Sequence, residues 1–398
     1  NVSDTEVYSA TTTEFFDKLE AMSDEQKEIM PVYDGEFLLT AHGAGSYTSR
    51  TVTKRWNRRC EQLADAAERY STAAFVNGLC NYPQYSLDKA WKNVIAHHFH
   101  DDITGTSFEE CYKRNHNDYV QAMNTFSEEY TSACNSLSDL LDTSWVEGTV
   151  VIVSNPLQSD RRDAVSVAIK SKSNYFAVFD KNGTEIPSQC KSLSQSEKII
   201  TFIADVPSCG LAVYDMRETD SSCNISTDLS VSTAYIENKY INVRLDENGD
   251  IYSVFDKRLN RELLSKPIRL ALLNNTHSFD WPAWEIKYDD CKNEPYAYPQ
   301  NPQITVKENG CALCSVLVTR YIGKSRFTQE ISLSSESEYV SVYNETDWRE
   351  EASLLKAEFS FTAKNKYANY DIGLGYTQRS TNTEKLSEVP AQKWADIT

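Results

Sequence analysis

Apolar residues between positions 49 and 140 recur at intervals of three and four, which is the spacing of one face of an α-helix. Three such stripes follow one another, and the short polar turns between them predict three long antiparallel helices. Charged residues opposite the first stripe, among them Lys54 and Arg55, are interpreted as a solvated helix face. We therefore predict a three-helix bundle over residues 49–146. The first stripe consists of Val52, Trp56, Cys60, Leu63, Ala67, Tyr70 and Ala74.

Capping signals stand at the starts of the second and third helices. Ser86 is predicted to cap the second helix, whose packed side would include His98. Ser107 is followed three residues later by Glu110, which is the capping-box pattern and makes Ser107 the expected N-cap of the third helix. The turn between these two helices is then Thr104-Gly105-Thr106.

From Gly148 onward apolar residues alternate with polar ones, the pattern of β-strands with one buried side. Short strands within residues 147–222 predict a small β-sandwich, and the polar stretch 217–226 predicts a linker. A second, larger β-region is expected at residues 223–398, beginning with a hairpin whose turn is Asn248-Gly249. The chain reaches its last residue without a closing element, so this region is predicted to be truncated.

Residues 1–48 do not have the pattern of a complete domain. An amphipathic helix is predicted at 13–22, and a turn followed by a strand at 31–40. One helix and one strand cannot bury each other's apolar sides, so the segment is predicted to belong to something larger. The chain begins at Asn1 in polar sequence without a signal peptide, which is expected of a mature protein, a trimmed chain or a fragment.

Charge narrows the classes of partner. The 398 residues carry a formal net charge of −18, which argues against nucleic acid and against an anionic membrane surface as the partner. No apolar run approaches the roughly 20 residues of a membrane-spanning helix, so no membrane partner is expected. The length suits roughly two to four domains.

The 10 cysteines allow more than one interpretation. Cys311 and Cys314 have the spacing of half a metal site, but no second pair exists, and the alternation around them predicts a strand. An even number permits disulfides without requiring them. Together with the cysteines, Asn-x-Ser/Thr sequons favour a secretory or extracytoplasmic location over the cytoplasm, although the compartment stays open. These sequons begin at Asn1, Asn182, Asn224, Asn274 and Asn344.

Three of the 6 histidines lie within residues 97–100, directly before Asp101, Asp102 and a Thr-Gly-Thr turn. Imidazole nitrogen and carboxylate oxygen are ligands that a zinc-type divalent ion prefers. One hypothesis is therefore a metal site. The alternative is a helix end whose histidines are exposed or packed, because no His-x-x-x-His pattern accompanies them. A turn at the end of a bundle cannot surround a metal by itself, so another domain would have to complete such a site.

The stretch His100-Asp101-x-Ile103-Thr104-Gly105-Thr106 resembles the signature of family 38 glycoside hydrolases, the retaining α-mannosidases. The resemblance covers most of the chain. It implies that residues 1–48 are a remnant, or C-terminal edge, of an α/β catalytic barrel and that residues 223–398 are a truncated, galactose-mutarotase-like β-supersandwich. Further stretches resemble family segments in the same order, namely Gly35-Glu-Phe, Ser46–Arg50 with Lys54-Arg55, Val153–Pro156, Asn238–Ile241, Asp246–Gly249 with Asp256-Lys257, Trp281–Ile286 and Val389–Ile397.

In that family one zinc ion is held by a His-x-Asp pair near the N-terminus, by the aspartate nucleophile and by the histidine of the signature. The resemblance thus implies that His100 is a zinc ligand and that Asp101 hydrogen-bonds sugar hydroxyls of a mannose-containing glycan. The nucleophile forms a covalent glycosyl-enzyme, and a second carboxylate serves as acid and then base. Both groups, and the other zinc ligands, are expected upstream of Asn1 in the missing N-terminal catalytic barrel.

The isolated chain is accordingly expected to be inactive. Phe99 stands where eukaryotic members often have histidine, and Asp102, which replaces a small residue, is predicted to be exposed. The alternative hypothesis is a non-catalytic carbohydrate-binding or assembly module derived from the family. Such a module would bind glycans through Trp281 and Trp284. The sequence leaves self-association into a homo-oligomer open.

Overall fold

The computed structural model describes residues 7–39, 42–278, 280–380 and 388–397. The chain divides into two compact units, residues 1–39 and 40–398.

The first unit holds two short helices, α1 (Thr12–Glu20) and α2 (Asp24–Glu28). Both begin with a capping box, formed around Thr11 and Ser23, and neither contains a buried residue. The predicted helix is confirmed. The predicted strand is wrong for the described residues 31–39, which contain none, because a lone strand finds no ladder partner in this unit.

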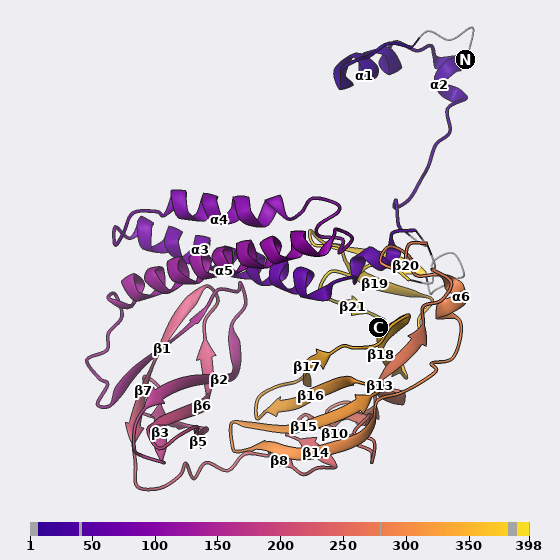
Figure 1. Ribbon diagram of the computed structural model, residues 1–398. Coiled ribbons are helices and arrows are strands. Elements are labelled where there is room, and N and C mark those ends of the chain that lie inside the picture. The colour runs from indigo at the N-terminus through magenta and orange to yellow at the C-terminus, as the bar shows by residue number, and fades with distance from the viewer. Residues whose placement is uncertain (1–6, 40–41, 279, 381–387, 398) are drawn as a thin grey trace. The chain divides into compact units, whose positions relative to one another are not determined.

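The second unit opens with a 3₁₀ turn, η1 (Ala44–Tyr47), and three helices, α3 (Thr51–Val76), α4 (Gln84–Ala96) and α5 (Glu109–Ser138) (Figure 1). Within the described residues, no helix is both long and apolar enough to cross a bilayer. The three helices share one core, which contains Cys60, Ala64, Ala67, Leu87, Ala90, Val94, Tyr119, Ala122 and Phe126.

Both predicted serine caps in this region are wrong. Ser86 lies inside the first turn of α4, where its hydroxyl donates to the Pro83 carbonyl at 3.2 Å and contacts Glu129 at 2.5 Å. The N-cap of α5 is Phe108, without a side-chain hydrogen bond. The Ser107 amide donates instead to the hydroxyl of Tyr112 on α5 at 3.0 Å, so this side chain takes the place of the predicted cap.

Two antiparallel sheets follow the helices, with strand orders β1-β7-β3-β4 and β2-β6-β5. Apolar side chains from β1, β3, β6 and β7 form a single core, in which Val178, Ile200 and Phe202 are fully buried. The strands are β1 (Thr149–Asn155), β2 (Arg161–Lys170), β3 (Phe176–Phe179), β4 (Glu185–Ile186), β5 (Ser188–Ser192), β6 (Glu197–Val206) and β7 (Gly210–Glu218).

The remaining strands form three further sheets, ordered β18-β13-β11-β10-β9-β8 with β12 beside β11, β14-β15-β16-β17 and β20-β19-β21. They are β8 (Ser230–Val231), β9 (Tyr235–Glu237), β10 (Ile241–Leu245), β11 (Ile251–Asp256), β12 (Arg261–Glu262), β13 (Leu264–Asn274), β14 (Gln300–Asn309), β15 (Leu313–Ile322), β16 (Ser325–Ser334), β17 (Ser341–Asp347), β18 (Ser353–Phe361), β19 (Tyr367–Asp371), β20 (Tyr376–Ser380) and β21 (Ala395–Asp396), with the short helix α6 (Tyr288–Cys291) between β13 and β14.

The predicted β10–β11 hairpin is confirmed. Gly249 takes a positive φ of 76°, and the Asp246 carboxylate accepts the amides of Asn248 and Asp250, each at 2.9 Å. A Cβ on Gly249 would lie 2.4 Å from the Val318 side chain, so β15 leaves room there for glycine alone. The prediction of helices followed by antiparallel sheets is therefore confirmed.

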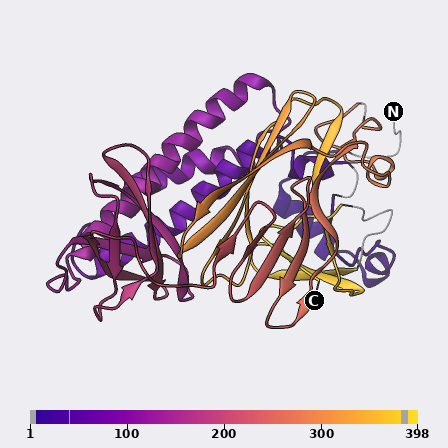
Figure 2. The ribbon, with the colours of Figure 1, turned by 90° about the horizontal axis from the view of Figure 1, so that it is seen from below.

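The helices contact the first pair of sheets through two tyrosine hydroxyls. Tyr70 on α3 donates to the Gly210 carbonyl at 2.8 Å, and Tyr130 on α5 contacts the Ser154 hydroxyl at 2.5 Å. Seen from below, strands β1–β7 lie in front of one end of these helices (Figure 2). The helical layer and the first β-region are thus joined by hydrogen bonds as well as by apolar contacts.

Asp215 on β7 holds the connection between α5 and β1. Its carboxylate is fully buried and accepts the amides of Glu147 at 3.1 Å and Gly148 at 2.8 Å, and the Arg217 guanidinium donates to it at 2.7 Å. Burial by itself raises the pKa of Asp215, but these hydrogen bonds and the neighbouring charge outweigh it and hold the pKa below its usual value.

We expect Asp215→Asn to lower the free energy of unfolding by roughly 1–3 kcal/mol at pH 7, because a donor amide would replace an acceptor oxygen. A carboxyl with a lowered folded-state pKa stabilises the protein above its unfolded pKa near 3.9, and that stabilisation is lost as the pH falls through the folded value. The difference from wild type should therefore shrink in denaturant titrations as the pH falls below about 4. Asp220→Asn, an exposed change, is the control, and equal stability at pH 7 would contradict the assignment.

Candidate functional site

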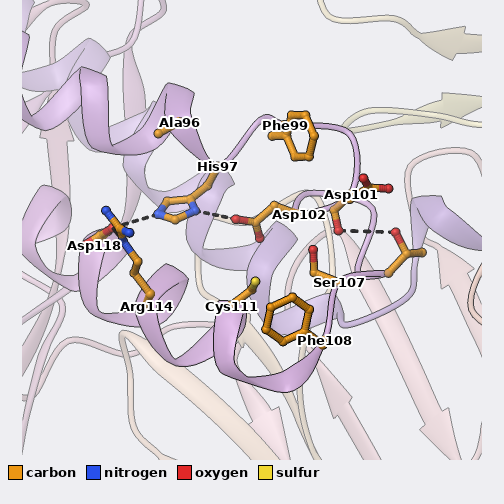
Figure 3. A pocket seen from close by; sticks show the side chains of 11 residues that line it. Ala96, His97, Phe99, Asp101, Asp102, Ser107, Phe108, Cys111, Arg114 and Asp118 are labelled. Atoms are coloured by element: carbon orange, nitrogen blue, oxygen red, sulfur yellow. Dashed lines mark hydrogen bonds and ion pairs between the residues drawn. The ribbon is translucent and has the colours of Figure 1, made fainter.

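The connection between α4 and α5, residues 97–108, is called here the histidine loop (Figure 3). The helix α4 ends at Ala96, and His97 is its C-cap. Side chains beyond that point no longer follow helical spacing. The loop turns back at Gly105, whose φ of 83° lies in the left-handed region.

His97 is the buried histidine of the loop, 7% exposed. Its Nδ1 lies 2.6 Å from Asp102 Oδ2, and its Nε2 lies 3.1 Å from Asp118 Oδ2 on α5 (Figure 3). Asn115 donates to the second Asp102 oxygen at 2.8 Å. The ring is therefore held between two carboxylates, and this arrangement anchors the loop to α5.

This arrangement corrects two predictions. His98 is exposed rather than packed, and its Nε2 lies 2.7 Å from Asn57 Oδ1. Asp102 is not exposed, because its side chain points inward to His97. Both errors have one cause, namely that the prediction continued the helical phase through the loop although the helix ends before it.

His100 and Asp101 point away from this core. Their side chains are 73% and 44% exposed, and His100 Nε2 lies 3.4 Å from Asp101 Oδ2. The backbone beneath them is fixed by threonines, since Thr104 donates to the His100 carbonyl and Thr106 donates to the Asp101 carbonyl at 3.3 Å. The structure thus presents the two predicted site residues together, on a rigid backbone and open to solvent.

Lys54 on α3 reaches under the loop. Its ammonium donates to the Ile103 carbonyl at 2.7 Å and to the Ser49 carbonyl. Burial lowers the pKa of Lys54 to about 8. The prediction of a solvated face is therefore wrong for this residue, which joins the histidine loop to the segment preceding α3.

A third segment, which contains Ala283 and Trp284, binds the residues that precede α3. The Ser49 hydroxyl donates to the Ala283 carbonyl at 2.5 Å, and the Gly45 amide donates to the Trp284 carbonyl at 2.9 Å. Gly105 packs directly on this support, because a Cβ placed there would lie 2.5 Å from the Ser49 carbonyl oxygen. Segments far apart in the sequence thus build one platform.

A cavity of about 800 Å³ opens beside the platform (Figure 3). Asp101 and the His97–Asp102–Asp118 group line it together with two exposed aromatic rings, Phe99 and Phe108. Carboxylates that accept hydrogen bonds and rings that cover apolar faces are suited to a polyhydroxylated ligand.

The donor chemistry of His100 and Asp101 suits a zinc-type ion, but two ligands do not complete a tetrahedral site. Across the described residues, no group of three or more histidine, cysteine, aspartate or glutamate side chains is placed to hold a metal ion. Cys314 is buried in β15 and Cys311 donates to the Ser188 carbonyl, as expected of a structural pair.

The two tryptophans of the alternative hypothesis, Trp281 and Trp284, differ in their surroundings. Trp281 is 56% exposed, whereas the Trp284 ring stacks on His42 with centroids 5.9 Å apart and its carbonyl anchors Gly45. The roles of His97 and Lys54 were not predicted, because no local sequence pattern marks either residue. Their partners lie on other helices or across a loop.

Comparison with known proteins agrees with this architecture. A profile described as "Glycosyl hydrolases family 38 C-terminal domain" matches residues 236–398, and one described as "Alpha mannosidase middle domain" matches residues 42–137. The second match includes α3–α5 and the histidine loop.

Among curated relatives, alpha-mannosidase G of Dictyostelium discoideum is 25% identical over 98% of this chain and 38% of its own length. Mouse alpha-mannosidase 2C1 is 25% identical over 91% of this chain and 33% of its own. The chain thus spans little more than a third of these relatives.

A solved structure of a glycosyl hydrolase family 38 protein from Enterococcus faecalis superimposes with a TM-score of 0.71 at 16% identity, covering 92% of this chain and half of that one. At this identity the likeness shows the fold. The two domain profiles together match most of the chain and show that it belongs to glycoside hydrolase family 38, over the middle and C-terminal domains.

Proposed function

We propose that this chain forms one wall of the active site of a zinc-dependent, retaining α-mannosidase that hydrolyses terminal α-mannosyl linkages of glycans. The observation that carries the proposal is the exposed His100–Asp101 pair on a platform of three chain segments. Both side chains are open to solvent, and Asp101 also lines the cavity.

In this proposal His100 is a zinc ligand and Asp101 accepts hydrogen bonds from mannose hydroxyls. A bound zinc ion would supply positive charge and a fixed position for sugar oxygens. The protein's own contribution is orientation. Thr104 and Thr106 fix the backbone under both residues, and Lys54 fixes the loop against α3.

The groups that break the glycosidic bond would come from a catalytic barrel outside this chain. Two carboxylates are needed, one to form the glycosyl-enzyme and one to protonate the leaving oxygen and then activate water. Residues 1–48 would be the C-terminal edge of that barrel. Apolar side chains left exposed on the first unit support the need for a covering domain; they include Val7, Phe15, Phe16, Ile29, Val32 and Phe37.

The same proposal assigns the other domains. Residues 49–146 would be the three-helix middle domain, residues 147–222 a small β-sandwich, and residues 223–398 the β-supersandwich. The shared helical core and the single core between the first two sheets support the first two assignments. Sequence upstream of Asn1 should then contain an early His-x-Asp pair in an alternating strand–helix pattern, and an unrelated domain there would instead favour a non-catalytic module.

His100→Ala in the full-length protein should lower kcat/KM for an α-mannoside by at least about 100-fold and reduce bound zinc, since loss of even a supporting metal partner costs 10- to 100-fold. Zinc content by mass spectrometry and initial rates measure the two effects. His98→Gln, at the exposed histidine two residues earlier in the loop, is the matched control and should retain both activity and zinc. Wild-type turnover in His100→Ala would refute the assignment.

The isolated chain should bind zinc weakly, because His100 and Asp101 fill at most two of four positions. Dialysis against a chelator should therefore leave the chain without zinc while its circular dichroism stays unchanged. Stoichiometric zinc that survives this treatment would contradict the proposal that the other ligands lie outside the chain.

Gly105→Ala tests whether the platform positions the pair. A positive φ costs roughly 1–3 kcal/mol for a residue with a Cβ, and the Cβ would also lie 2.5 Å from the Ser49 carbonyl oxygen. Gly78→Ala is matched, with a φ of 72° and nothing within 4 Å. We expect activity of the full-length protein to fall in Gly105→Ala and to persist in Gly78→Ala; equal activity in the two would show that the contact is dispensable.

A further inference from the structure

Three cysteines from distant parts of the chain line a second cavity, of about 290 Å³, away from the histidine loop. Cys190 lies on β5, Cys223 lies in the connection between β7 and β8, and Cys311 lies in the turn between β14 and β15. All are free thiols in the structure. The cavity therefore sits where the two β-regions meet.

The turn that carries Cys311 is docked firmly on β5. The Gln189 side-chain oxygen accepts the amides of Ala312 at 3.2 Å and Leu313 at 2.9 Å. Gly310 lies so close that a Cβ on it would be 2.0 Å from the same oxygen. The position of Cys311 relative to β5 is thus fixed by side-chain and backbone contacts.

The connection that carries Cys223 is tied to the same turn. Thr227 donates to the Cys311 carbonyl at 2.9 Å, and the Cys223 thiol contacts the Ile186 carbonyl at 3.9 Å. The Cys311 thiol donates to the Ser188 carbonyl at 3.2 Å. Ile186 is the last residue of β4 and Ser188 the first of β5, so the two thiols contact carbonyls only two residues apart in the chain.

Both thiols line the same cavity. Burial raises the pKa of Cys311 to about 11, and the charge and hydrogen bonding of the Cys223 side chain act in the same direction. The third cysteine does not complete a metal site, since no three potential ligands converge anywhere in the described residues. A pair of adjacent thiols remains, with no metal to bind.

We propose that Cys223 and Cys311 are a dithiol that a small-molecule disulfide, such as oxidised glutathione, converts to a disulfide bond. The Cys223 thiolate attacks one glutathione sulfur, forms a mixed disulfide and releases one glutathione thiolate. The Cys311 thiol then gives up its proton, attacks the Cys223 sulfur and releases the second glutathione. Two protein thiols lose two electrons and two protons, and oxidised glutathione becomes two reduced molecules.

The bond would join the β7–β8 connection to the β14–β15 turn, beside the hydrogen bond from Thr227 to the Cys311 carbonyl. A crosslink that closes so long a loop restricts the unfolded chain strongly. This inference does not depend on the proposed function, because neither thiol touches the histidine loop.

The test equilibrates the complete chain in glutathione buffers of increasing oxidised fraction at pH 8.5, followed by acid quenching, alkylation and non-reducing peptide mapping. We expect a linked Cys223–Cys311 peptide to accumulate and the thermal midpoint to rise with it. Cys223→Ser and Cys311→Ser should abolish both effects. Cys209→Ser is the matched control. Cys209 is exposed and directly precedes β7, whereas Cys223 follows it, so this variant should retain both the linked peptide and the higher thermal midpoint.

Peptide mapping of the unmutated chain keeps the test independent of how the variants fold. Full alkylation of Cys223 and Cys311 in every buffer would overturn the proposal. Linkage of either residue to Cys190, or glutathione attached without a second exchange, would overturn it equally.

Discussion

The geometry of the site depends on the two hydrogen bonds that the Lys54 ammonium donates. This ammonium joins the Ser49 and Ile103 carbonyls, one before α3 and one in the histidine loop, and no other described side chain links these two backbones. Its lowered pKa shows the cost of burying this charge. Because the folded-state pKa of about 8 lies below the unfolded value, the charged form opposes folding at neutral pH, and that penalty fades as the pH rises toward 10. The contact persists because it fixes two carbonyls that would otherwise lack donors.

The buried and the exposed side chains of the histidine loop differ in the partners that they have. His97, Asp102 and Asp118 hydrogen-bond to one another beneath the surface, whereas His100 and Asp101 pair with each other and are exposed to solvent. A buried inner layer that supports an exposed outer pair is the arrangement that a preorganised binding site requires. The two residues that the sequence motif singles out are thus exposed side chains of the loop.

Periodic features of the sequence were sufficient to predict the helices, the change to strands after Gly148 and the Asn248-Gly249 turn. Each depends on neighbours within a few residues. Strand β13, although it contains Leu270–Leu273 and pairs with β18, was not predicted, because its continuous apolar run lacks alternation. The cap predicted at Ser107 was wrong because the Ser107 amide donates to the hydroxyl of Tyr112 on α5. His100 and Asp101 were found through a motif, whereas the Lys54 and Ala283 contacts connect segments that no local pattern relates.

The hydrogen bond from Ser49 to Ala283 has a consequence for the order of events during synthesis. At about 5 to 20 residues per second, the ribosome needs roughly 10 to 35 s to proceed from the histidine loop to that carbonyl. During this interval the helices can pack, but Ser49, on which Gly105 packs, lacks its hydrogen bond to the Ala283 carbonyl. Completion of the site is thereby coupled to emergence of the second β-region, so a nascent chain that stalls before it cannot present a finished surface for His100 and Asp101.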